Sequence, residues 1–143
     1  MIENHLATVK LHLQRASFSY EQLKRVKINI DLFDEPEQIK TIDAFIFRFI
    51  KLQDFMGEKL FKSFLDSIGE YNEIMSLLDA LDRMEKLGII QNADDWMNYR
   101  KIRNKLTHEY PNNQNEIIEG IKTALNIFEK IEDIVKVIEN YRK

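Results

Sequence analysis

Apolar residues recur at alternating steps of four and three positions along most of this chain, which is the spacing of one buried face of an α-helix. An N-terminal series runs from Ile2 to Ile30, and a C-terminal series runs from Ile117 to Ile138. Two shorter series, Ile42 to Met56 and Ile74 to Met84, lie between them. No stretch shows the sustained alternation of apolar and polar residues that a half-buried strand needs. We therefore predict an all-α fold without a sheet.

Few residues interrupt these series, because the chain has only four glycines and two prolines. Asp34-Glu35-Pro36 separates the first helix from the second, and the proline suits the first turn of the new helix. Gly69 and Gly88 are positioned to end the second and third helices. Asn92, followed three residues later by Asp95, resembles a capping box and predicts that a fourth helix starts near Ala93.

The last boundary lies between the fourth and fifth predicted helices. Pro111 disfavours helical geometry at Tyr110, so the fourth helix should end close to His108. The fifth should start near residue 114 or 115 and run to about Asn140. The result is an up-and-down bundle of about five helices, four long and one shorter, in a single domain over residues 1–143. We interpret the apolar seams as core, and the additional use of one seam in a dimer stays open.

Composition excludes several classes of protein. A hydrophobic content of 44% with 31% charged residues excludes a disordered chain. The absence of cysteine removes disulfides, thiolate nucleophiles and cysteine-based zinc sites. No apolar run approaches the roughly 18 residues of a membrane span, and the N-terminus lacks the pattern of a signal peptide, so we expect a cytoplasmic protein with no membrane partner. With a net charge of −3, any binding of nucleic acid must depend on a local basic patch.

The segment from Arg103 to Pro111 combines an arginine, a histidine and a tyrosine at the end of a predicted helix. Arginine holds phosphate through a fixed fork of donors, and histidine transfers protons near neutral pH. On a regular helix Arg103 lies beside the buried face that Trp96, Tyr99, Ile102 and Leu106 would form. A charge in that position needs a partner, and Asp43 and Asp54 on the second helix are the candidates.

The spacing within this segment limits its chemistry. Arg103 and His108 are five residues apart, hence about 140° apart around a straight helix. The two side chains meet only if the helix unwinds near His108 or if a second subunit completes the cleft. A two-fold dimer would also combine the charges of Arg100, Lys101 and Lys105 with that of Arg103 into a groove for RNA. The plainer interpretation, in which these cations complement the helix dipole and His108 is a cap, stays open.

Other chemistry-bearing residues form no obvious constellation. His5 and His12 are seven positions apart with no acidic residue between them, so we interpret them as surface or core-edge residues and expect no metal or cofactor. The spacings of Asp54 to Lys51 and to Glu58 also suit a solvated face, and Asp54 and Asp43 are the candidates for the acid of a cleft. Gly57, within the second helix, suggests the close approach of another helix or backbone, and a dimer contact is one candidate for it.

The motif Arg103-x4-His108-x-Tyr110 resembles that of the HEPN superfamily (higher eukaryotes and prokaryotes nucleotide-binding), and within it the HepT-like branch. Asn104 directly after the arginine, and the ending Thr-His-Glu-Tyr-Pro, also resemble that branch. The helical layout resembles the family over the whole chain, whereas the specific motif spans only eight residues.

The resemblance implies a metal-independent endoribonuclease, a hydrolase that acts as the toxin of a toxin–antitoxin pair. Arg103 and His108 would be catalytic, in a composite cleft of a homodimer, with Asn104 and Thr107 in support. The antitoxin partner would be a minimal nucleotidyltransferase that silences the nuclease by AMPylation of Tyr110. The alternative implied by some relatives is a non-catalytic nucleotide- or substrate-binding partner of such a nucleotidyltransferase.

Overall fold

The computed structural model describes residues 1–107 and 114–141, and within these ranges every regular element is helical. The elements are α1 (Ile2–Lys24), a short 3-10 helix η1 (Ile30–Asp34), α2 (Pro36–Phe55), a π-helical turn η2 (Met56–Leu60), α3 (Phe61–Ser67), α4 (Leu77–Lys86), α5 (Ala93–Leu106) and α6 (Gln114–Tyr141). Because α2, η2 and α3 follow one another without a break, they form one continuous rod. The described chain therefore has five helical rods, which confirms the predicted all-α bundle.

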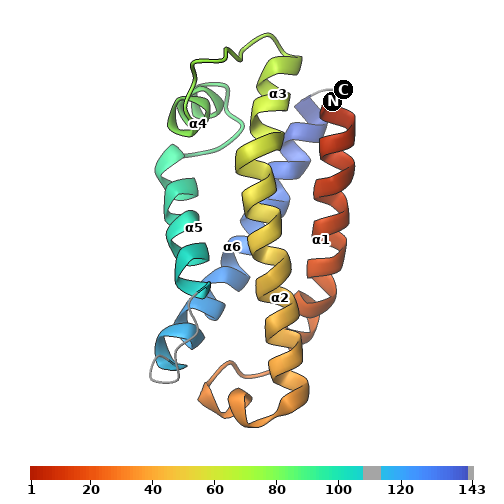
Figure 1. Cartoon of the computed structure of the whole chain (residues 1–143), viewed down its shortest axis with the longest axis vertical. Helices are drawn as coiled ribbons and strands as arrows, with labels where there is room; N and C mark the ends of the chain where they lie inside the picture. Colours follow the sequence, from red (N-terminus) through yellow and green to blue (C-terminus); the bar gives the residue numbers. More distant parts are fainter. Residues whose placement is uncertain (108–113, 142–143) are drawn as a thin grey trace.

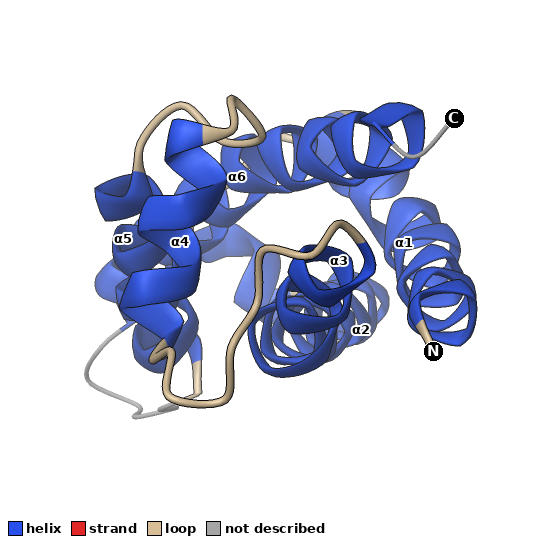
Figure 2. Cartoon of the chain, turned by 90° about the horizontal axis from the view of Figure 1, so that it is seen from above, coloured by secondary structure: helices blue, strands red, loops and turns tan. Residues whose placement is uncertain are grey.

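The rods alternate in direction (Figure 1). α1 runs down the bundle, the α2–η2–α3 rod returns beside it, α5 runs down again and α6 returns. The short α4 joins the second rod to α5 at one end, and seen from above α4 and α5 lie on the side opposite α1 (Figure 2). The start of α1 and the end of α6 share one end of the bundle, whereas the C-terminal end of α5 lies at the other.

The first helix is shorter than its apolar series predicts. α1 ends at Lys24, and Ile30, which would continue the seam, lies in η1 with 47% of its surface exposed. Val26 and Ile28 are β-branched and favour helix weakly. Asn29 then starts a new turn, because its side-chain oxygen accepts a hydrogen bond from the N–H of Asp31 at 2.9 Å.

The prediction that two helices end at glycines is confirmed. Gly69 and Gly88 have φ of 75° and 76°, in the left-handed region that favours glycine. The N–H of Glu70 bonds the carbonyl of Leu65 at 2.8 Å, and that of Ile89 bonds the carbonyl of Met84 at 2.9 Å. Both bonds close the six-to-one ring of a Schellman motif, which satisfies carbonyls left free at a helix end.

The start of α4 differs from prediction. Ile74 is 91% exposed and precedes the helix, because Ser76 and Asp79 form a reciprocal capping box that begins it at Leu77. The predicted box between Asn92 and Asp95 is not the one found. Asn92 does cap α5 at the predicted position, but its side chain accepts from Asp94, at 2.7 Å.

The core runs the length of the bundle and is rich in aromatic rings. Fully buried side chains include Phe45, Phe49, Phe61, Trp96 and Phe128, with Tyr20 and Phe128 in contact at a centroid distance of 4.7 Å. The interpretation of the seams as core is therefore confirmed for most of their residues in α1, α2 and α6, and for Leu81 and Met84 in α4. No helix in the described ranges combines the length and apolarity needed to cross a membrane.

A close contact sets the position of the last helix against the end of α5. A Cβ placed on Gly120 of α6 would lie 3.0 Å from Cδ2 of Leu106. A side chain at Gly120 would require Leu106 to shift by a few tenths of an ångström, so the glycine favours this close approach of α6 to the last residue of α5. The bounds of α6, Gln114 to Tyr141, agree with the predicted 114 or 115 to about 140.

His5 and His12 lie at the edge of the core, as predicted, on either side of Phe55. His5 Nδ1 is 2.9 Å from the hydroxyl oxygen of Ser63, and His12 Nδ1 is 3.3 Å from a terminal nitrogen of Arg48. Burial lowers the pKa of His5, with Lys59 adding to the effect, and burial followed by Arg48 lowers the pKa of His12.

The left-handed φ of Gly88 gives a test of the fold. We expect Gly88→Ala to reduce the free energy of unfolding by about 1 kcal/mol, because nothing lies within 4 Å of the new Cβ and the cost is backbone strain alone. Gly57→Ala is the matched control, since its Cβ would meet only ordinary contacts, 3.6 Å from Trp96 Nε1, within a helical backbone. Its stability should equal or exceed that of the wild type. Urea denaturation measures both, and equal losses would contradict the assignment.

The two histidines give a second test, through pH. Their folded-state pKa values lie below the ordinary value, so the folded protein binds fewer protons than the unfolded chain as pH falls through that region. Their contribution to stability is present above about pH 6.5 and is lost as pH falls through the lowered pKa values. Denaturation at about pH 7.5 and pH 5.5 should show a smaller loss for the His5→Gln/His12→Gln variant than for the wild type. An unchanged loss would refute this.

Candidate functional site

The candidate site is built on α5, whose buried face attaches it to the bundle. Trp96, Tyr99 and Leu106 are buried and Ile102 is half-buried, which confirms the predicted face. Trp96 packs edge-on against Phe61 of the α2–α3 rod at a centroid distance of 4.7 Å. This packing holds the following turn of α5 beside the C-terminal half of α2.

The centre of the site is an ion pair between α5 and α2. Arg103 donates from Nη2 to Oδ2 of Asp54 at 2.7 Å, and from Nη1 to Oδ1 of Asn104 at 2.7 Å. Asp54 is therefore the partner that the position of Arg103 requires. Asp43, the other candidate, is exposed about three turns earlier in α2, so it is not the partner in this structure. Among the described residues, the salt bridge of Asp54 is with Arg103 and not with Lys51.

The pair lies at the surface of the groove between α2 and α5. The side chains of Arg103 and Asp54 are 31% and 37% exposed, so solvent and ligands reach them. A pair this exposed contributes less than about 1 kcal/mol to stability because water screens it. Its main consequence is orientation: two of the five N–H donors of the guanidinium are engaged, and the planar group is held in one direction.

Regular helical structure ends immediately before the second half of the motif. α5 ends at Leu106, where Thr107 is the C-cap, and the N–H of Thr107 bonds the carbonyl of Arg103 at 3.2 Å. The Thr107 hydroxyl donates to the carbonyl of Asn104 at 2.6 Å. The predicted helix end close to His108 is thus confirmed. His108 and Tyr110 themselves lie outside the described residues.

The predicted RNA-binding cations do not share one face of α5. Arg100 is about 60° around the axis from Arg103, so the two lie on the same side of the helix. Lys101 and Lys105 are each two residues from Arg103, hence about 160° away on the opposite side. All three are exposed. Within one chain only Arg100 adds its charge to the groove beside Arg103.

A cavity adjoins the ion pair, and sequence reasoning did not find it. It has a volume of about 220 Å³ and lies between the rod and the first turns of α4 and α5. Asp54, the acid of the ion pair, also lines this cavity. The other lining residues include Gln53, Gly57, Glu58, Lys62, Trp96 and Arg100. The close approach predicted from Gly57 is made by Trp96 of the same chain, whose Nε1 lies 3.6 Å from a Cβ placed on Gly57.

Several buried polar atoms at this groove find no hydrogen-bond partner among the described residues. They are Oε1 and Nε2 of Gln53, Nε1 of Trp96 and Nε of Arg103. Folded proteins satisfy most buried polar groups, so this concentration is unusual. The sequence contains one sign of this cavity, which is Gln53. This amide lies four residues after Phe49 and three before Met56, a position that helical spacing buries.

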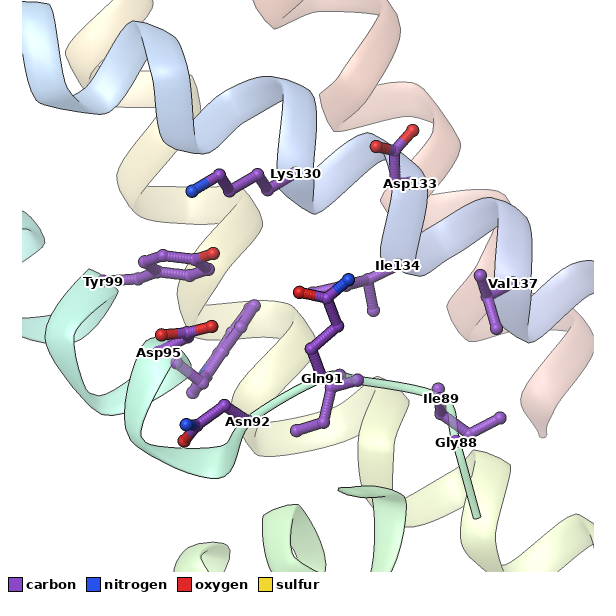
Figure 3. A pocket seen from close by; sticks show the side chains of 12 residues that line it. Gly88, Ile89, Gln91, Asn92, Asp95, Tyr99, Lys130, Asp133, Ile134 and Val137 are labelled. Carbon is purple, nitrogen blue, oxygen red and sulfur yellow. The ribbon is translucent and has the colours of Figure 1, made fainter. Parts of the chain in front are cut away.

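A second cavity, of about 390 Å³, lies on the other side of Trp96, between α5 and α6. Figure 3 shows Tyr99, Asp95 and Gln91 directed into it, with Lys130 of α6 above them and Ile134 and Val137 on the α6 side. Burial, followed by the charge of Asp95, raises the pKa of Tyr99. Arg103 and Asp54 do not line this cavity.

Across residues 1–107 and 114–141, no three histidine, aspartate or glutamate side chains converge in a way that could hold a metal ion. The polar groups at the site are the guanidinium of Arg103, its partners Asp54 and Asn104, and those of the adjoining cavity.

No model of a known protein family matches this chain, and no curated protein of similar sequence is found.

The exposure of the Arg103–Asp54 pair predicts a weak coupling. We expect a double-mutant cycle of Asp54→Ala and Arg103→Ala to give a coupling of about 0.2–1 kcal/mol, which falls as salt is raised. Urea denaturation of the four proteins measures it. The exposed pair Lys10–Glu139, with an N–O distance of 2.7 Å, is the matched control and should give a similar value. A coupling of about 3 kcal/mol or more would identify a structural, desolvated pair instead.

Proposed function

We propose that this chain is an endoribonuclease of the HepT-like branch of the HEPN superfamily, acting as the toxin of a toxin–antitoxin pair. The observation that carries the proposal is the fixed guanidinium of Arg103. Asp54 and Asn104 orient it at the surface of a groove, and it stands one turn before the end of a helix that stops at Leu106. This is a position from which an arginine can engage a phosphate.

The donors of Arg103 suit a phosphoryl centre. A guanidinium has five N–H donors, and Asp54 and Asn104 engage one on each terminal nitrogen. Because Nε is buried, one further N–H on each terminal nitrogen is left to bind phosphate oxygens, which arginine contacts in pairs. A preoriented cation stabilises the extra negative charge of a phosphorane without reorganising during the reaction. Asp54 and Asn104 are, in this proposal, positioning residues that act through Arg103.

The proposed reaction is an internal transfer on RNA. The 2′-hydroxyl oxygen forms a bond to the adjacent phosphorus as its proton leaves to solvent, and the bond from phosphorus to the 5′-oxygen breaks. His108 donates a proton to that departing oxygen as general acid. The products are a 2′,3′-cyclic phosphate and a free 5′-hydroxyl, so no redox partner or cofactor is consumed. Thr107, bonded to the Asn104 carbonyl, supports the turn that leads to His108.

The remaining parts of the proposal concern partners. RNA is the substrate, and a homodimer brings the Arg103 of one subunit near the His108 of the other. Across a two-fold axis, Lys101 and Lys105 can contribute to the groove even though they face away from Arg103 within one chain. A minimal nucleotidyltransferase antitoxin adds AMP to Tyr110, and the added phosphate repels RNA from the cleft. The site of action is the cytoplasm.

A second candidate function is favoured by the cavity beside Asp54. Three unpartnered buried polar atoms, on Gln53 and Trp96, belong to residues that line this cavity beside the exposed Arg100, and they suit the binding of a nucleotide without its cleavage. In that case the chain is a nucleotide- or substrate-binding partner of a minimal nucleotidyltransferase. The two candidates differ in whether RNA is cut.

RNA cleavage in EDTA separates them. We expect the wild type to cut structured RNA and leave cyclic phosphate and 5′-hydroxyl ends, and we expect Arg103→Ala and His108→Ala each to lose at least about a hundredfold in rate. The matched controls are Arg15→Ala and His5→Gln on α1, which should retain activity. Intact RNA after incubation with the purified wild type, together with measurable nucleotide binding, would replace the nuclease with the binding partner.

A further inference from the structure

The unpartnered atoms beside the ion pair define a specific chemistry. Gln53, only 2% exposed, offers an acceptor and a donor on one planar amide, and Trp96 offers an indole N–H. The complementary ligand needs a donor and acceptors on one edge. A nucleobase has this pattern, and the amide side chains of proteins bind adenine in a bidentate manner.

The volume of the cavity limits what can occupy it. At about 220 Å³ it exceeds the share of a single water, about 30 Å³, several-fold. It is also smaller than the roughly 300–1,000 Å³ of pockets for drug-sized ligands. A flat ring system the size of one base lies between these limits.

The wall of the cavity has an unusual backbone. Met56–Leu60 forms a π-helical turn, where the N–H of Phe61 bonds the carbonyl of Met56. Such turns insert one extra residue into a helix and recur at functional sites. Here the turn places Gly57 against the edge of Trp96. Because glycine has no Cβ, no methyl group packs against the indole N–H at this point.

We propose that this cavity is a specificity pocket that takes one base of the RNA, whose edge Gln53 and Trp96 bind while its backbone runs past Arg103. The proposal rests on the proposed nuclease and names its substrate preference. Asp54 lines the cavity and holds Arg103, so a base in the pocket and a phosphate at the guanidinium are neighbours along one strand. Arg100, exposed at the mouth, meets the adjoining phosphate.

Entry of the base requires side chains to move, because the amide atoms of Gln53 and the indole nitrogen of Trp96 are covered in this structure. Glu58 is exposed and Lys62 is half-buried at the cavity, and both are long and flexible. In this proposal the incoming base displaces these two side chains and reaches the edges of the amide and the indole.

Two variants change the pocket in different ways. Gly57→Ala adds a methyl 3.6 Å from Trp96 Nε1, an ordinary contact that the fold accepts but that covers the indole N–H. Gln53→Leu keeps the approximate shape and removes both amide atoms. Gln91→Leu is the matched control, because Gln91 lines the cavity on the other side of Trp96 and not this one.

The first arm measures binding. Trp96 is the only tryptophan of the chain, so its fluorescence, with calorimetry as a second measure, reports on this pocket. Each of the four ribonucleoside monophosphates, and short RNAs blocked by 2′-O-methyl groups, is titrated into the wild type. We expect the RNAs to bind with a preference for one base. Gln53→Leu and Gly57→Ala should each weaken the affinity for the preferred RNA by about 5- to 150-fold, which is the range for one bidentate base contact. Gln91→Leu should leave this affinity unchanged. Tighter binding of a free monophosphate than of RNA would overturn the RNA assignment.

The second arm measures cleavage, and it separates this inference from the proposed function. We expect wild-type cuts to cluster beside the preferred base, and those of Gln53→Leu and Gly57→Ala to spread over all four bases, with a lower rate beside the preferred one. Cleavage with an unchanged base pattern in both variants would overturn the pocket and leave the nuclease standing. Base-selective binding without cleavage would support the proposed base pocket and contradict the proposed nuclease activity. Folded variants that bind RNA as the wild type does would show that the cavity holds water alone.

Discussion

The packing of Trp96 against the α2–η2–α3 rod is the contact on which the arrangement of this molecule depends. The indole is 1% exposed, lies edge-on to Phe61 and approaches the backbone at Gly57. It fixes α5 against the rod two turns before Arg103, and so determines which acid of α2 that arginine meets. It also forms the wall between the two cavities. A change in this one contact would move the ion pair, both cavities and the end of α5 together.

Features of the fold that depend on neighbouring residues could be predicted from the sequence. The left-handed ends at Gly69 and Gly88, the start of α2 at Pro36 and the cap at Asn92 each need only a few adjacent side chains. The errors at Ile30 and Ile74 have a shared cause. Both residues keep the apolar spacing of a helix, but Asn29 and Ser76 bind the backbone locally and begin a new element nearby. Periodicity gives no warning of such competition.

The candidate site could be predicted in part. A charge beside a buried face needs a partner, which was enough to predict Asp54 for Arg103, though not to exclude Asp43. The cavity could not be predicted, because it depends on the π-helical turn at Met56–Leu60. One extra residue in a turn changes which side chains of the rod face α5, and no motif in the chain marks the insertion. Gln53 was the sole local sign, as an amide at a position that helical spacing buries.

Both ends of the bundle's path, the start of α1 and the last turn of α6, lie together at one pole, and the C-terminal end of α5 lies at the other (Figure 1). The ion pair of Lys10 with Glu139 joins the two helices near that pole. A fluorophore, affinity tag or surface tether attached to the start of α1 or the end of α6 is therefore held at the pole opposite Leu106. Immobilised or labelled protein keeps the C-terminal end of α5 away from the support, which makes single-molecule observation of this end practicable.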